Sequence, residues 1–142
     1  MLHYGWKLKM AMEKEMERKI KILIVDDEKE ICELVKSYFI RRGYDVFTAN
    51  SGMQAIGLIN ENNPQILLLD KIMPDMTGIE LLQIVRAFDQ DIKVIMISGD
   101  ELDEETKLQI KELGVFDYLN KPVIISLLYA AVIKLVSLLL NE

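Results

Sequence analysis

Residues 66–70, Ile-Leu-Leu-Leu-Asp, form an unbroken apolar run that ends in a carboxylate. Unbroken runs of this length, without the polar alternation of a half-exposed strand, are typical of strands buried on both faces of a parallel sheet. Three further runs share this character: 22–25 (ILIV), 94–97 (VIMI) and 115–119 (VFDYL). A weaker run at 44–48 is rich in aromatic and β-branched residues. We therefore predict five strands, four of them buried on both faces.

Helical patterns separate the predicted strands. The first helix has one apolar stripe at a 3.6-residue period, made of Ile31, Leu34, Val35, Tyr38 and Phe39. Gly43 ends this helix. The second and third helices begin at capping boxes, Ser51 with Gln54 and Thr77 with Glu80, which satisfy free backbone N–H groups.

The last two helices differ in polarity. The segment 101–113 is mostly charged and is followed by Gly114, a residue suited to a left-handed cap, so we expect this helix to pack most loosely. The final helix begins after Pro122, runs close to the C-terminus and has apolar residues on nearly every face. Because a helix that covers a sheet needs only one apolar stripe, the excess predicts a second partner surface, most simply a homodimer through this helix.

Strand and helix alternate five times with short connections. This order predicts a parallel sheet with right-handed crossovers and helices on both faces. The expected fold class is α/β: a doubly wound (βα)5, flavodoxin-like three-layer sandwich with a five-stranded parallel sheet. The chain has 142 residues, the length of one domain. We assign residues 20–142 to that domain and residues 1–19 to an N-terminal extension. Residues 10–19 of the extension are helix-prone. The alternative is that residues 1–19 are dispensable, or that translation starts later, at Met10, Met12 or Met16.

Composition and charge narrow the function classes. With 23 acidic and 17 basic residues the net charge is −6, which disfavours direct binding to nucleic acid. Cys32 is the single cysteine, so no internal disulfide forms and a reducing, cytoplasmic location fits best. Residues 1–19 lack the features of a secretory signal, and Lys134 interrupts the apolar segment 124–140, so no membrane role is expected.

Polar residues follow four of the predicted strands where each strand ends: Asp26 and Asp27, then Asp70, Ser98 and Lys121. The carboxyl ends of parallel strands meet at one edge, where doubly wound domains bind their ligands. Three carboxylates crowded there repel one another unless a cation neutralises them. Oxygen ligands without cysteine or a nearby histidine favour Mg²⁺, with Mn²⁺ as an alternative.

A lysine and a hydroxyl beside a metal–carboxylate cluster suit an incoming phosphoryl group, which makes Asp70 the natural nucleophile. Each residue also has a plainer interpretation. Asp26 and Asp27 alone would be helix caps, Ser98 a loop hydroxyl and Lys121 a solvated charge. Their placement at successive strand ends favours a common site.

The same positions carry a resemblance to a known family. Residues 25–28 (VDDE), Asp70 with Met73, Pro74 and Gly78, Ser98 with Gly99, and 117–122 (DYLNKP) resemble the receiver domains of response regulators in two-component signalling. The similarity spans about residues 19–142. The order of these motifs makes the set specific, although each one alone is common.

The resemblance implies roles for the residues at the site. Asp27, Asp70 and the backbone carbonyl of Ile72 would bind Mg²⁺, with Asp26 close by or acting through water. Asp70 would be the phosphoacceptor and Lys121 would pair with the phosphoryl oxygens. Ser98 would then move to hydrogen-bond the phosphoryl group.

The resemblance also implies that Tyr118 turns inward with Ser98, which switches a partner-binding surface. From the residues alone, an aromatic residue in a short strand such as Tyr118 is more often part of the core. A cis peptide is expected before Pro122, and Pro74 and Gly78 would shape the loop after Asp70. Asp100 adds a negative charge near the phosphoryl position and is expected to slow anionic donors.

The implied partners follow from the same resemblance. The only histidine, His3, lies outside the domain pattern, so the phosphoryl donor would be a sensor histidine kinase or a phosphotransfer protein. The output would be a downstream target protein or a fused output domain, and the chain would be a signalling switch rather than an enzyme. The alternative is a small Mg²⁺-dependent phosphohydrolase with an aspartyl nucleophile, but such enzymes place an acid where this chain has Ile72.

Overall fold

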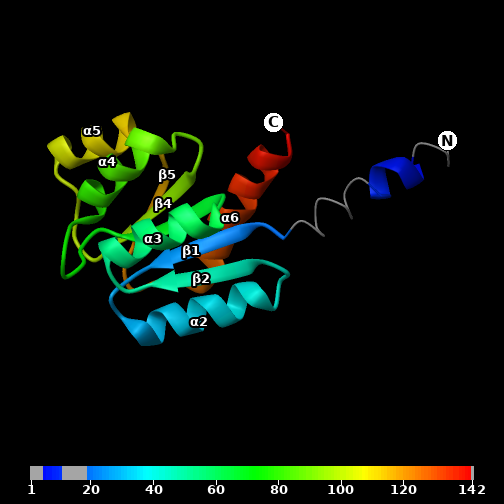
Figure 1. Ribbon diagram of the computed structural model, residues 1–142, viewed down its shortest axis with the longest axis horizontal. Helices are drawn as coiled ribbons and strands as arrows, with labels where there is room; N and C mark the ends of the chain where they lie inside the picture. The colour runs from blue at the N-terminus through cyan, green and yellow to red at the C-terminus, as the bar shows by residue number, and fades with distance from the viewer. Residues whose placement is uncertain (1–4, 11–18, 142) are drawn as a thin grey trace.

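The computed structural model describes residues 5–10 and 19–141 (Figure 1). Within residues 19–141, five strands alternate with five helices. The strands are β1 (Lys21–Val25), β2 (Asp45–Ala49), β3 (Ile66–Asp70), β4 (Lys93–Ser98) and β5 (Val115–Asn120). The helices that follow them in turn are α2 (Lys29–Ile40), α3 (Gly52–Asn62), α4 (Gly78–Phe88), α5 (Glu104–Glu112) and α6 (Ile125–Leu140).

All strand pairs are parallel and their spatial order is β2-β1-β3-β4-β5. Helices α2 and α6 cover one face of the sheet, and α3, α4 and α5 cover the other (Figure 1). Successive strand residues point to opposite faces, so Ile22 and Ile24 pack under α2 and α6 while Leu23 and Val25 pack under α3 and α4. The predicted doubly wound α/β class is confirmed.

The central strand β3 is buried along its whole length, as its unbroken apolar run predicts. For β5 the prediction of burial on both faces is wrong, because Phe116 and Asn120 are exposed and the remaining four residues are half-buried. Two features explain the difference. This strand lies at the edge of the sheet, and α5, which covers it, buries none of its own residues. The expectation that the charged helix packs most loosely is therefore confirmed.

The helix ends follow the predicted caps with small differences. Ser51 and Thr77 accept hydrogen bonds from the amides of Gln54 and Glu80 at 3.2 Å and 3.1 Å. The reciprocal bond of the first box runs from Asn50 rather than from Ser51, at 2.8 Å. Gly114, after α5, has a φ of 72°, and Gly43, three residues beyond the end of α2, has a φ of 92°. Both values belong to the left-handed region, which glycine adopts without strain.

Helix α5 begins at Glu104, three residues later than predicted. The side chain of Asp103 accepts a hydrogen bond from the Thr106 amide at 2.7 Å and so forms the N-cap. The residues before the helix, 100–103 (DELD), are mostly charged and show no apolar periodicity from which to place this boundary.

Most of the helix-prone stretch 10–19 lies outside the described residues, and residues 5–10 are helical. Among the helices described, none has the length and apolar character needed to cross a membrane.

Candidate functional site

The carboxyl edge of the sheet gathers the polar residues that follow the strands. Backbone hydrogen bonds hold adjacent strand ends in register there: the Lys121 amide donates to the Ser98 carbonyl at 2.8 Å, and the Lys71 amide donates to the Ile97 carbonyl at 2.9 Å. Asp70 is the last residue of the central strand. Its side chain is consequently fixed by the most buried element of the fold.

Three carboxylates meet at this edge. Asp26, Asp27 and Asp70 each offer an oxygen, and these oxygens lie within 4.8 Å of one another. Asp26 and Asp70 are buried, whereas Asp27 is exposed and leaves the cluster open to solvent on one side. The sequence prediction that these three residues come together is confirmed.

The interpretation of the aspartate pair as a helix cap does not hold. The N-cap of α2 is Glu28, and it makes no side-chain capping bond. Asp26 instead accepts a hydrogen bond from the Glu28 amide at 2.9 Å. Its backbone carbonyl accepts from the side-chain Nδ2 of Asn50 at 3.0 Å and from the buried Cys32 thiol at 3.3 Å, so Cys32 packs as expected and also helps to position Asp26.

Lys121 lies among the carboxylates. Its Nζ is 3.0 Å from Oδ2 of Asp70, 3.4 Å from Oδ2 of Asp26 and 3.3 Å from Oε1 of Glu28. The side chain of Lys121 is 19% exposed, so the solvated-surface interpretation is wrong. Sequence reasoning did not single out Glu28 as a partner; its position directly after the aspartate pair was the only signal.

The pKa values of Asp26 and Lys121 reflect this crowding. Burial raises the pKa of Asp26 to about 6, and the neighbouring charge of Asp70 adds to the rise, while the Glu28 amide and Lys121 oppose it. Burial lowers the pKa of Lys121, but its hydrogen bond to Asp70 and the charges of Asp26 and Asp70 outweigh that effect and raise the pKa overall. Lys121 is therefore a permanent cation at the site.

The donor set fits a hard divalent cation. Three carboxylates and the nearby Glu28 face a single ammonium group, so the cluster carries excess negative charge in a partly buried place. Carboxylate oxygens open to solvent on one side match the ligands of Mg²⁺, which keeps several waters in its coordination sphere. The acidic cluster is of the type that binds Mg²⁺ in receiver domains.

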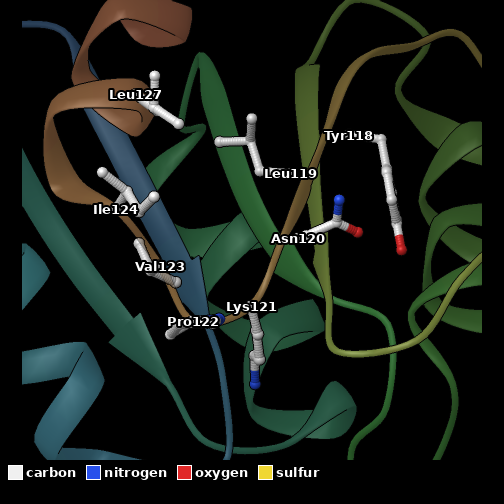
Figure 2. A pocket seen from close by; sticks show the side chains of 8 residues that line it. All are labelled: Tyr118, Leu119, Asn120, Lys121, Pro122, Val123, Ile124 and Leu127. Carbon is white, nitrogen blue, oxygen red and sulfur yellow. The ribbon is translucent and has the colours of Figure 1, made fainter.

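Ser98 and Tyr118 are both hydrogen-bonded to the backbone of Asp100. Ser98 is buried, and its Oγ accepts a hydrogen bond from the Asp100 amide at 3.1 Å. The Tyr118 hydroxyl donates to the Asp100 carbonyl. Figure 2 shows Tyr118 on the opposite side of β5 from Leu119, with its ring away from the Lys121 side chain. Asp100 thus connects the two residues that the resemblance assigns to switching.

The loop between β3 and α4 shapes the rim of the site. Gly78 is required there, because a Cβ on this residue would sit 2.5 Å from the backbone oxygen of Asp70. Pro74 is exposed in this loop, and the Ile72 side chain is 57% exposed. On the far side, the peptide between Lys121 and Pro122 is cis, as predicted.

Sequence comparisons agree with this geometry. The family model for the response regulator receiver domain matches residues 22–133. A curated relative, sporulation initiation phosphotransferase F of Bacillus subtilis (strain 168), is 39% identical over 103 residues, which cover 72% of this chain and 82% of that protein. The probable transcriptional regulator ycf27 of Guillardia theta is 38% identical over 110 residues, 76% of this chain but 42% of the longer relative.

Solved structures share the fold. The CheY-like receiver domain protein of Methanospirillum hungatei JF-1 matches with a TM-score of 0.76 at 28% identity, covering 82% of this chain and 92% of that one. The receiver domain of Francisella response regulator 1452 matches with a TM-score of 0.71 at 35% identity, covering 81% and 95% of the two chains. This chain belongs to the response regulator receiver domain family, the CheY-like domains of two-component phosphorelay signalling.

Proposed function

We propose that this receiver domain accepts a phosphoryl group on the Asp70 carboxylate in a Mg²⁺-dependent reaction and thereby switches its partner-binding surface. The observation that carries the proposal is the environment of Asp70. It ends the fully buried central strand, its Oδ2 is 3.0 Å from the Lys121 ammonium, and two further aspartates share its pocket. We place the domain boundaries at residues 20–142.

The ligands of the ion would be the carboxylates of Asp27 and Asp70 and the backbone carbonyl of Ile72, with Asp26 binding directly or through water. When bound, Mg²⁺ supplies charge neutralisation for the phosphoryl oxygens. The Asp70 carboxylate attacks phosphorus in line, a P–O bond to Asp70 forms, and the bond between phosphorus and the donor breaks with its electron pair leaving on the donor. Lys121 exchanges its contact with Asp70 for the new phosphoryl oxygens.

The conformational change would be transmitted from Ser98 to Tyr118 through the backbone of Asp100. Ser98 Oγ accepts from the Asp100 amide, and the Tyr118 hydroxyl donates to the Asp100 carbonyl. If Ser98 turns to hydrogen-bond the phosphoryl group, its bond to the Asp100 amide is lost and the loop that holds Tyr118 rearranges. Tyr118 then turns inward, and the surface formed by α5, β5 and α6 changes.

The phosphoryl donor would be a separate protein, a sensor histidine kinase or a phosphotransfer protein, in the same cytoplasm. The name of the Bacillus subtilis relative, a phosphotransferase of sporulation initiation, is consistent with a relay of this kind. The output is a downstream target or a fused output domain. Receiver domains are in general signalling switches rather than enzymes. No described observation favours the phosphohydrolase alternative, since the apolar Ile72 offers no acid for a leaving group.

A homodimer is proposed through α6. This helix buries Leu128, Ala131, Val132 and Leu135 against the sheet and leaves Ile124, Leu127, Ile133, Leu138 and Leu140 exposed. Near its start, Leu119, Val123, Ile124 and Leu127 help to line a groove of about 380 Å³ (Figure 2). A second copy would cover this apolar surface.

The test of the phosphoacceptor function is intact-mass analysis after incubation with acetyl phosphate and Mg²⁺. The proposal predicts the addition of one phosphoryl group to the wild type and none when a chelator is added. The Asp70→Asn variant, with its fold checked by circular dichroism, should also stay unmodified. Modification that persists in Asp70→Asn would contradict the assignment of the acceptor.

A further inference from the structure

We infer that Asp75 is a positioning residue that ties the loop after Asp70 to the N-terminus of α3 and thereby sets the position of the Ile72 carbonyl. The inference deepens the proposed function and rests on it, because Ile72 matters only if the pocket binds Mg²⁺. Asp75 lies five residues beyond the proposed phosphoacceptor and outside the carboxylate cluster.

The contacts of Asp75 are made with both carboxylate oxygens. Oδ1 accepts from the Gly52 amide at 2.8 Å, and Oδ2 accepts from the Met53 amide at 3.0 Å. These amides are two of the N–H groups that a helix start leaves without an intrahelical partner. Ser51 takes the next one, that of Gln54. The start of α3 is thus capped in part by its own residue and in part by a residue from the distant loop.

The carboxylate is bound in one orientation. Asp75 is exposed, yet the hydrogen bonds from Gly52 and Met53 hold its pKa below the ordinary value, as expected for charge-assisted bonds at the positive end of a helix. Met76, the next residue, also lies close to the start of α3, because a Cβ on Gly52 would meet the Met76 side chain at 2.3 Å. Two successive loop residues therefore dock on the same helix start.

The other end of the loop is anchored separately. The Gly78 amide donates to the Lys71 carbonyl at 2.7 Å, and Ile72 forms an isolated antiparallel bridge with Thr77. Ile72 is itself part of this anchor, three residues before Asp75. Its side chain is 57% exposed, so apolar packing does little to hold it, and its amide makes only a long bond of 3.3 Å to Asp70 Oδ1. The burial of the next residue, Met73, and the hydrogen bonds elsewhere in the loop therefore supply the restraint.

This restraint has a chemical consequence at a Mg²⁺ site. Mg²⁺ requires near-ideal octahedral geometry, so binding is weaker when the position of a ligand carbonyl fluctuates. Groups that orient the direct ligands of a metal typically change its affinity by about 10–100-fold when they are removed. The two hydrogen bonds of Asp75 would act on the Ile72 carbonyl indirectly, by restraining the loop three residues further along the chain.

The experiment is a Mg²⁺ titration by isothermal calorimetry on the wild type, Asp75→Ala and Ser51→Ala. Ser51→Ala is the matched control, because it removes a cap from the same helix without touching the loop. We expect the Kd for Mg²⁺ to rise about tenfold in Asp75→Ala and to stay within about twofold of wild type in Ser51→Ala, which has no link to Ile72. Both variants should show a lower urea midpoint.

A second readout separates positioning from general damage. Phosphorylation of Asp75→Ala by acetyl phosphate should be slow at limiting Mg²⁺ and return to the wild-type rate when Mg²⁺ is saturating. Asp75→Asn keeps one acceptor oxygen, so its phosphorylation rate at limiting Mg²⁺ should fall between those of the wild type and Asp75→Ala. This variant replaces Asp75→Ala in the experiment if Asp75→Ala does not fold.

Wild-type Mg²⁺ affinity in the Asp75 variants would overturn the inference, and so would an equal loss in Ser51→Ala. A wild type that binds no Mg²⁺ would instead overturn the proposed function, and the inference with it.

Discussion

The Lys121 ammonium lies 3.0 Å from Oδ2 of Asp70, and this contact passes across the end of β4, which separates β5 from β3 in the sheet. One lysine therefore joins the edge strand to the central strand at the proposed phosphorylation site. The same group is a direct competitor of a metal ion for the carboxylates, because both neutralise the same charge.

Replacing Lys121 should separate metal binding from phosphoryl transfer. In Lys121→Met, Mg²⁺ affinity should equal or exceed that of the wild type, since a competing cation is gone, while the phosphorylation rate should fall by at least about tenfold because a group that stabilises the phosphoryl charge is lost. Calorimetry and intact-mass kinetics measure the two effects. Lys107→Met, which removes a lysine paired with exposed Glu104, is the control. Phosphorylation of Lys121→Met at the wild-type rate would refute the role of this lysine.

The raised pKa of Asp26 predicts a pH-dependent cost in the metal-free protein. Because burial raises the pKa from 3.8 to about 6, the native state holds this proton more tightly than the unfolded state. The stability that Asp26 contributes is therefore present below pH 3.8 and is lost as the pH rises through about 6. Without Mg²⁺, Asp26→Asn should be more stable than wild type by about 1–2 kcal/mol near neutral pH.

Urea denaturation with and without Mg²⁺ measures this effect. Added Mg²⁺ should stabilise the wild type more than the variant, and Mg²⁺ affinity should fall as the pH drops below about 6, where Asp26 takes up its proton. Equal urea midpoints for wild type and Asp26→Asn at neutral pH without Mg²⁺ would show that the buried Asp26 carboxylate does not destabilise the native state.

Gly78 and Gly57 form a matched pair for testing the loop. A Cβ on Gly78 would sit 2.5 Å from the Asp70 backbone oxygen, so Gly78→Ala should destabilise the domain by about 1–3 kcal/mol. Gly57 is exposed within α3 and a Cβ there meets nothing within 4 Å. Gly57→Ala should raise the free energy of unfolding by about 0.5–1 kcal/mol. Urea midpoints of the two variants that shift in the same direction would contradict this account.

The negative charge of Asp100 should slow anionic phosphoryl donors. Asp100 is exposed, two residues beyond Ser98, and its replacement by asparagine removes one repulsive charge close to the pocket. Asp100→Asn should react several-fold faster with acetyl phosphate at low ionic strength, and added salt should reduce the difference. Asp45→Asn makes the same change in net charge at the start of β2, at the edge of the sheet opposite the site, and serves as the control. An equal acceleration in both variants would refute a local effect.

The exposed apolar residues of α6 predict self-association. Sedimentation velocity should detect a dimer at micromolar concentrations, and Leu127→Asp, which places a charge in the groove, should dissociate it. Ser126→Asp puts the same charge on the neighbouring exposed position and controls for charge alone. A wild type that remains monomeric at high micromolar concentration would contradict the dimer.

The parts of the fold that follow from local chemistry could be predicted from the sequence. The apolar run at 66–70 places a buried central strand, and the hydroxyls of Ser51 and Thr77 mark helix starts. The clustering of Asp26, Asp27 and Asp70 was also predictable, since these residues end a strand or follow one directly. These signals depend only on neighbouring residues, which the sequence displays.

The parts that depend on three-dimensional neighbours could not be predicted. The run 115–119 is apolar except for Asp117, but its place at the edge of the sheet decides its exposure. Glu28 reaches Lys121 from 93 residues away, and Asp75 reaches Gly52 from 23 residues away. For Glu28 the only local signal is its position after the aspartate pair, and nothing in the local pattern of Asp75 distinguishes it from a solvated surface charge.

The central claim, that Asp70 carries the phosphoryl group, is tested most directly by locating the modification. After incubation with acetyl phosphate and Mg²⁺, borohydride reduction converts a phosphoaspartate to homoserine, and peptide mass spectrometry then identifies the position. The account predicts homoserine at residue 70 and nowhere else. Homoserine at Asp26 or Asp27, or a phosphoryl group that resists reduction and resides on a hydroxyl side chain, would contradict it.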